Sequence, residues 1–148
     1  MGLPLQEISV TVVLDLNVIL DFLLEREQFV ESAEVLVAAS EGKIDAVIPL
    51  HGITTIYYFL RKERGDSASR ALLKDVLKAA RIVSISDLDV RTAIESRIPD
   101  LEDAIVAETA AIVKADYILT RDIRGFANAP VPAISPLDFL KKHGRTLR

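Results

Sequence analysis

The sequence of 148 residues contains no cysteine, which excludes disulfide bonds, thiol catalysis and zinc sites built on cysteine. It has only two histidines, which disfavours a catalytic or metal site built on imidazole groups. No apolar run approaches the roughly 18 residues of a membrane span, and no secretory signal pattern opens the chain. We therefore expect a cytoplasmic protein without a membrane association, in which any metal ion is held by oxygen ligands, as Mg²⁺ and Mn²⁺ prefer.

The composition is typical of one folded domain covering residues 1–148. Half of the residues are hydrophobic, which is enough for a sizeable core at this length. The net charge of −4 disfavours attraction of nucleic acid to the whole surface, so any nucleic-acid contact must be local. The candidates for such contacts are Arg61 and Lys62, which belong to one basic patch, and Arg121 and Arg124, which flank Asp122. Taken alone, the patch at Arg61 and Lys62 is equally typical of a solvated helix face.

Short apolar runs alternate with helical patterns along the whole chain, which predicts parallel βαβ units in an α/β fold. Strands are predicted at residues 10–14, 46–48, 82–85, 118–120 and 131–134. Helices are predicted at residues 18–25, 30–40, 52–64, 67–80, 87–96 and 103–115, with a short one after Ser135-Pro136. Gly65 is expected to end one of these helices.

Three acidic residues lie where predicted elements begin or end. Asp15 follows the first apolar run, Asp103 opens an alanine-rich helical stretch, and Asp122 follows the run at residues 117–120. Open α/β sheets bind their ligands at the carboxyl ends of their strands, so we expect these acids to share one site. Each acid also has a simpler interpretation, as a helix cap or as an acid favoured by a helix dipole.

Carboxylates that are brought together repel one another unless something neutralises them. A hard divalent cation does so while keeping water molecules for chemistry, and two such ions can hydrolyse a phosphodiester without histidine or cysteine. Asn17 and Thr120 each lie two residues from a key aspartate, so they could orient carboxylates or waters. The pattern therefore favours metal-dependent phosphodiester chemistry.

The ordered motifs resemble the PIN-domain ribonucleases, particularly the toxins of prokaryotic toxin–antitoxin pairs. The motifs are Asp15-Leu-Asn17, Ile56-Tyr57-Tyr58, Leu101-Glu-Asp103, Thr120-Arg-Asp122 and the ending Pro132-Ala-Ile-Ser-Pro136-Leu-Asp-Phe-Leu140. The resemblance covers nearly the whole chain. It implies a three-layer α/β/α sandwich around a mainly parallel five-stranded sheet and an endoribonuclease that depends on Mg²⁺ or Mn²⁺. It also implies a homodimer and an antitoxin partner.

By the family pattern, Asp15, Asp103 and Asp122 are metal-binding and catalytic acids, supported by Asn17 and Thr120. Two positions depart from this pattern. Thr55 stands where the family has a glutamate, and Gly125 stands where the family has an aspartate before the phenylalanine. Glu102 could supply a further acid, although neighbouring residues of a helix point to different faces.

Other functions fit fewer of these residues. A phosphatase of the haloacid-dehalogenase type needs a second acid where this chain has Asn17. A phospho-accepting receiver domain needs a lysine after its last strand, where this chain has Ser135-Pro136. The main alternative is a PIN-like domain that has lost catalysis with the glutamate replaced by Thr55 and that binds RNA or a protein.

Overall fold

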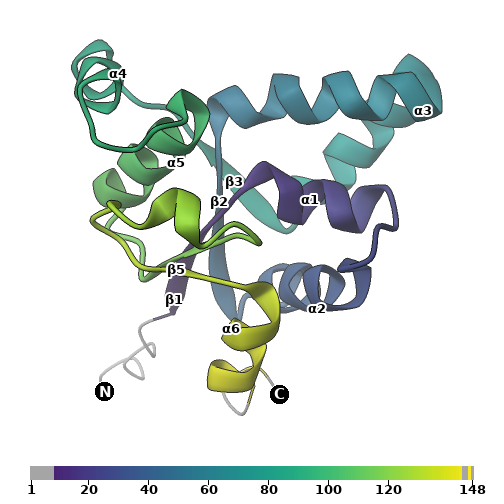
Figure 1. The fold of residues 1–148 in the computed structure, drawn as a ribbon. Coiled ribbons are helices and arrows are strands. Elements are labelled where there is room, and N and C mark those ends of the chain that lie inside the picture. Colours follow the sequence, from purple (N-terminus) through teal and green to yellow (C-terminus); the bar gives the residue numbers. More distant parts are fainter. Residues whose placement is uncertain (1–8, 145–146, 148) are drawn as a thin grey trace, which may run out of the picture.

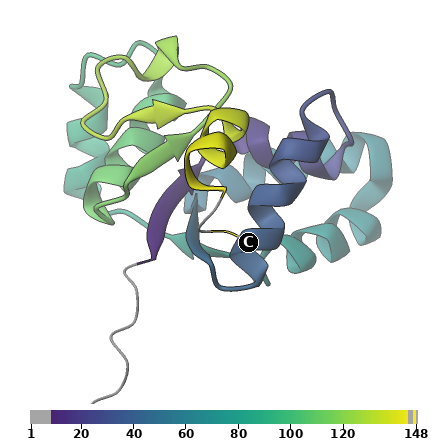
Figure 2. The same cartoon turned by 90° about the horizontal axis from the view of Figure 1, so that it is seen from below.

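The computed structural model describes residues 9–144 and 147, in which a parallel sheet is covered by helices on both faces (Figures 1 and 2). In chain order the elements are β1 (Val10–Leu14), α1 (Leu16–Leu23), α2 (Phe29–Ser40), β2 (Ile44–Pro49), α3 (Leu50–Val76), β3 (Ala80–Val83), α4 (Asp87–Ile94), α5 (Leu101–Ile112), β4 (Tyr117–Leu119), the 3₁₀ turn η1 (Arg124–Phe126), β5 (Ala133–Ile134) and α6 (Pro136–His143). Within these residues, no helix combines the length and apolar character needed to cross a bilayer.

The strands lie in the order β3-β2-β1-β4-β5, and every neighbouring pair is parallel. From β1 the chain builds the sheet outward through β2 and β3, and it later adds β4 and β5 on the other side of β1. The strand order therefore reverses between β1 and β4, where an open α/β sheet leaves a crevice at the carboxyl ends of its strands. The prediction of a three-layer α/β/α sandwich with five parallel strands is confirmed.

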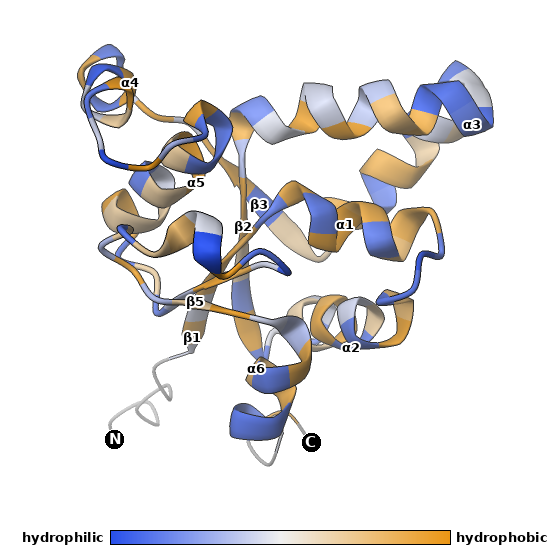
Figure 3. Cartoon of the chain, in the orientation of Figure 1, coloured by the Kyte–Doolittle hydropathy of each residue, from blue (hydrophilic) through white to orange (hydrophobic). Residues whose placement is uncertain are grey.

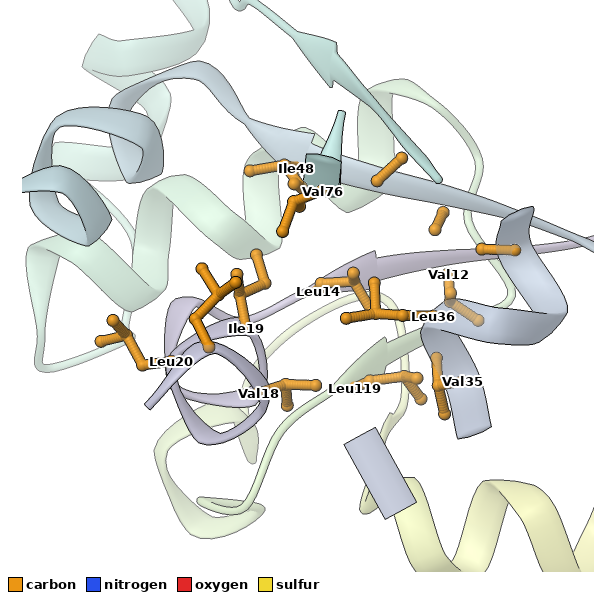
Figure 4. Packing of buried hydrophobic residues seen from close by; sticks show 14 of the residues in the cluster. Val12, Leu14, Val18, Ile19, Leu20, Val35, Leu36, Ile48, Val76 and Leu119 are labelled. Carbon is orange, nitrogen blue, oxygen red and sulfur yellow. The ribbon is translucent and has the colours of Figure 1, made fainter. Parts of the chain in front are cut away.

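Alternating residues of β1 face the two layers. Val12 and Leu14 belong to the larger core cluster with α1, α2, α3 and α6, whereas Val13 belongs to the smaller cluster with α4 and α5. Figure 4 shows Leu14 and Leu119 packed among side chains of α1 and α2. In Figure 3 the helices around the sheet carry both apolar and polar residues. Burial of such an aliphatic side chain contributes roughly 1.5–3 kcal/mol. Both faces of β1 are thus fixed, which makes its carboxyl end a rigid place for a site.

Several predicted boundaries need correction. The third strand is Ala80–Val83 rather than residues 82–85, because Ala80 pairs with Ala46 of β2. The preceding helix consequently ends at Val76 instead of residue 80. The last strand is only Ala133–Ile134. The predicted stop at Gly65, by contrast, is confirmed: this residue has the non-helical angles φ 76° and ψ 174°, so α3 consists of two helices that meet at a kink there.

Candidate active site

Asp15 and Thr120 lie side by side because Leu14 of β1 pairs with Leu119 of β4. The Thr120 hydroxyl donates a hydrogen bond of 2.9 Å to Oδ2 of Asp15. Asp15 occupies the N-cap position of α1, but its side chain makes no capping hydrogen bond, so the simple capping interpretation is wrong for this carboxylate. Asp15 is only 4% exposed, and burial raises its pKa even though the hydrogen bond from Thr120 lowers it.

Asp122 is held by the turn that follows β4. Its backbone N–H donates to Oγ1 of Thr120 at 3.0 Å, and the N–H of Gly125 donates to Asp122 Oδ1 at 3.1 Å. Asp122 therefore accepts one backbone N–H of this turn, in agreement with the simple interpretation, although the N-cap residue of η1 itself is Ile123. The other oxygen, Oδ2, remains available on the side of Asp103.

Gly125 marks the point where two carboxylates meet. A Cβ atom at this position would lie 2.6 Å from Oδ2 of Asp122 and 3.0 Å from Oδ2 of Asp103. Both oxygens thus reach the space that a side chain at residue 125 would occupy. The absence of a side chain at Gly125 is what lets the two acids approach this closely.

Asp103 lies in the first turn of α5. The helix begins at Leu101, two residues before the predicted start, because Asp100 is its N-cap and accepts the N–H of Asp103 at 2.9 Å. The sequence interpretation missed Asp100, although the spacing Asp-x-x-Asp before an apolar helix is a capping signal. Burial raises the pKa of Asp103 to about 7, with further contributions from Asp15, Asp100, Asp122 and Glu102.

Glu102 adds a fourth carboxylate to this region. Its Oε1 atom is buried and has no hydrogen-bond partner among the described residues. Burial raises its pKa most, followed by the charges of Asp100 and Asp15. A buried carboxylate oxygen without a donor, next to other acids, has the chemistry that a hard cation requires of a ligand. The donor chemistry of the site therefore fits Mg²⁺ or Mn²⁺.

The acids do not form a complete coordination shell on their own. Across residues 9–144 and 147, no group of three or more acidic or histidine side chains has the arrangement of a preformed metal site. Asn17 is half-buried in the first turn of α1, and Thr55 is half-buried on α3, which rises from the same edge of the sheet. Neither residue adds a charge to the four carboxylates.

The predicted basic residues lie on two elements. Arg121 and Arg124 flank Asp122 after β4, and Arg124 is exposed. Arg61 and Lys62 are exposed on α3, where the Lys62 ammonium lies 4.1 Å above the ring of Tyr58. Arg121 is engaged differently, because its Nε lies 2.7 Å from the buried carboxylate of Asp21. The sequence interpretation gave Asp21 no role.

Comparisons with known proteins agree with this architecture. The model of the PIN domain family matches residues 11–124. The VapBC2 complex of Rickettsia felis, solved with a DNA fragment from its promoter, contains a similar chain with a TM-score of 0.68 and 16% identity, covering 85% of this chain and 98% of that one. A toxin–antitoxin complex from Klebsiella pneumoniae contains another, with a TM-score of 0.64 and 22% identity, covering 84% and 97%. No curated protein matches the sequence significantly.

Proposed function

The chain belongs to the PIN domain family, and from this premise we propose that it is a metal-dependent endoribonuclease, the toxin of a toxin–antitoxin pair. The observation that best supports the proposal is that Asp103 and Asp122 bring carboxylate oxygens to one point beside Gly125. Burial and the neighbouring carboxylates also raise the pKa of Asp103 to about 7. Charged acids are costly to hold together in an apo protein, and a divalent cation removes that cost. The cluster therefore has the chemistry of a metal site rather than of a structural contact.

In this proposal Asp15, Asp103 and Asp122 hold Mg²⁺ or Mn²⁺, and Glu102 extends the negative field. A bound divalent cation would activate a water molecule and stabilise charge on the phosphate oxygens of RNA. Thr120 orients the site, since its hydroxyl donates to Asp15 and accepts the N–H of Asp122. Asn17 is proposed to support the same acids from the first turn of α1.

The proposed partners are RNA, a second copy of the chain and an antitoxin. The two solved complexes of similar fold contain antitoxins, which supports an antitoxin partner here. The small residues of α5 are already buried within the domain, including Ala104, Ala107 and Ala110. The proposal of a homodimer is therefore supported instead by exposed apolar side chains such as Val30 and Leu88, which are 59% and 70% exposed.

The proposed function is tested by incubating the purified protein with a generic single-stranded RNA, with and without Mn²⁺. We expect cleavage that requires the metal and that Asp15→Asn abolishes. Asp15→Asn should also weaken the rise in melting temperature that Mn²⁺ gives to the wild type, because the metal stabilises only the state that binds it. Metal-independent RNA binding without cleavage would instead favour the alternative of a domain that binds RNA and has lost catalysis.

Replacing Thr55 by Glu should restore the acid that the family has at this position. The added carboxylate should tighten Mn²⁺ binding and raise cleavage, whereas in the apo protein it should lower stability through repulsion. Thr54→Glu is the matched control, since Thr54 is the exposed neighbour and donates to the carbonyl of His51. Calorimetry measures the Mn²⁺ affinity of both variants, and melting curves measure the stability of their apo forms. Equal responses of the two variants would exclude Thr55 from the site.

RNA binding through the basic residues should appear in the salt dependence of the affinity. Removing one side chain that binds a phosphate of single-stranded RNA lowers the slope of log K against log salt by about 0.7. We expect this change for Arg124→Ala and for Arg61→Ala, measured by titration with a non-cleavable RNA. Arg97→Ala, at an exposed position after α4, is the control and should leave the slope unchanged. Unchanged slopes in all three variants would place the RNA elsewhere.

A further inference from the structure

Asp21 is a buried acid that the proposed reaction does not use. It lies on α1 and is 1% exposed, and neither of its carboxylate oxygens accepts a well-aligned hydrogen bond within the described part of the chain. Burial raises its pKa, while the charges of Arg121 and, more weakly, Arg26 lower it. Because an uncompensated buried carboxylate is costly, this residue needs the guanidinium that lies 2.7 Å from its Oδ2.

That guanidinium belongs to the segment which forms one wall of the candidate site. Arg121 stands between Thr120, which donates to Asp15, and Asp122, whose backbone N–H donates to the Thr120 hydroxyl. The ion pair with Asp21 therefore joins the buried face of α1 to the turn after β4. Arg121 itself remains 42% exposed, so its position is not fixed by burial of its own side chain.

We propose that Asp21 is a positioning residue which, through Arg121, holds the segment Thr120–Asp122 in the geometry that brings the Asp122 carboxylate to Asp103. This inference rests on the proposed function for its consequence in catalysis, but the geometry that it explains belongs to the apo protein. Partners that orient a metal ligand from outside the coordination shell typically change metal affinity or activity by 10–100-fold. Asp21 is a partner of this kind, because it holds Arg121, the chain neighbour of the proposed ligand Asp122.

The first test uses the metal-free protein and hydrogen exchange measured by NMR. In Asp21→Asn, which keeps the shape of the side chain and removes its charge, the N–H groups of Asp122 and Gly125 should lose protection. These are the groups that donate to Thr120 Oγ1 and to Asp122 Oδ1. Asp45→Asn is the matched control, because it breaks the Asp45–Arg81 ion pair on strands β2 and β3 without touching the turn. Wild-type protection in Asp21→Asn would overturn the proposal.

The second test measures Mn²⁺ affinity by calorimetry. Asp21→Asn should weaken Mn²⁺ binding 10–100-fold and lower kcat with little change in KM for RNA, while Asp45→Asn changes neither. Because Asp21 acts through Arg121, Asp21→Asn combined with Arg121→Gln should weaken binding no more than the larger of the two single changes. Additive effects would overturn the proposal. If the wild type neither binds Mn²⁺ nor cleaves RNA, the proposed function fails. Hydrogen exchange in the metal-free protein still decides whether Asp21 positions the turn. If Asp21→Asn does not fold, Arg121→Gln replaces it in the hydrogen-exchange measurement.

Discussion

Asp103→Asn is expected to abolish metal-dependent RNA cleavage, with a loss of at least about 100-fold, while making the metal-free protein more stable at and above neutral pH. A direct ligand should cost more than the 10–100-fold typical of residues that only orient ligands. The gain in stability follows from the charge that the substitution removes. In the apo protein the charged form of this carboxylate is disfavoured by burial and by four neighbouring acids, which together raise its pKa to about 7.

The pH dependence of stability follows from that raised pKa. In the unfolded chain the Asp103 carboxyl titrates near its usual value of 3.8, whereas in the folded protein it titrates near 7. Between these values the folded state holds a proton that the unfolded state lacks, so the contribution of Asp103 to stability falls as the pH rises. Above about pH 7 the Asp103 carboxyl is ionised in both states, and the loss of folding stability that it causes has reached its full value. Allowing for screening by water, it is on the order of 1–2 kcal/mol.

Melting curves of the apo protein between pH 5 and pH 8 check this expectation. Asp103→Asn should melt higher than the wild type at pH 8 and should lose much of the difference at pH 5. Asp87→Asn is the matched control, since Asp87 also lies in the first turn of a helix but is exposed and paired with Arg91. It should lower stability slightly through the helix dipole. If Asp103→Asn behaves like this control, Asp103 is only a favourable acid at a helix start.

The parts of the site that could be predicted from sequence are those fixed by the sheet. Asp15 and Asp122 each follow an apolar run, and parallel strands bring such residues to one edge; in the structure Asp15 lies beside Thr120 at that edge. Asp103 could be predicted because it opens a helix of small apolar residues. Its exact place in that helix could not, since the start depends on the cap at Asp100.

Contacts between segments far apart in the chain could not be predicted. The ion pair of Asp21 with Arg121 spans a hundred residues, and nothing in the sequence near Asp21 separates it from an ordinary exposed acid of a helix. The start of the third strand could not be predicted either, because Ala80 has a weak local preference for a strand and is in β3 only through its pairing with Ala46, whereas Ile82 and Val83 lie in the strand as predicted. Tertiary pairing, rather than local propensity, decides these features.

Gly125→Ala is expected to weaken Mn²⁺ binding about 10–100-fold while changing the stability of the apo protein by less than about 1 kcal/mol. The added methyl group would lie 2.6 Å from Oδ2 of Asp122 and 3.0 Å from Oδ2 of Asp103, so a carboxylate must move. Movement at the tip of a side chain costs the fold little. The same movement separates Oδ2 of Asp122 from Oδ2 of Asp103, which otherwise meet beside Gly125. Rotation of the Asp122 carboxylate also disturbs the hydrogen bond that its Oδ1 accepts from the N–H of residue 125.

Gly52→Ala separates this effect from a general consequence of adding a methyl group to a glycine. Gly52 lies within α3, where a Cβ atom would meet only Cγ2 of Ile48 at an ordinary 3.9 Å. Alanine favours a helix over glycine by roughly 0.5–1 kcal/mol, so this control should be at least as stable as the wild type and should bind Mn²⁺ equally well. Calorimetry and apo melting curves of both variants give the comparison. Wild-type Mn²⁺ affinity in Gly125→Ala would mean that the meeting point of Asp103 and Asp122 beside Gly125 is not where the metal binds.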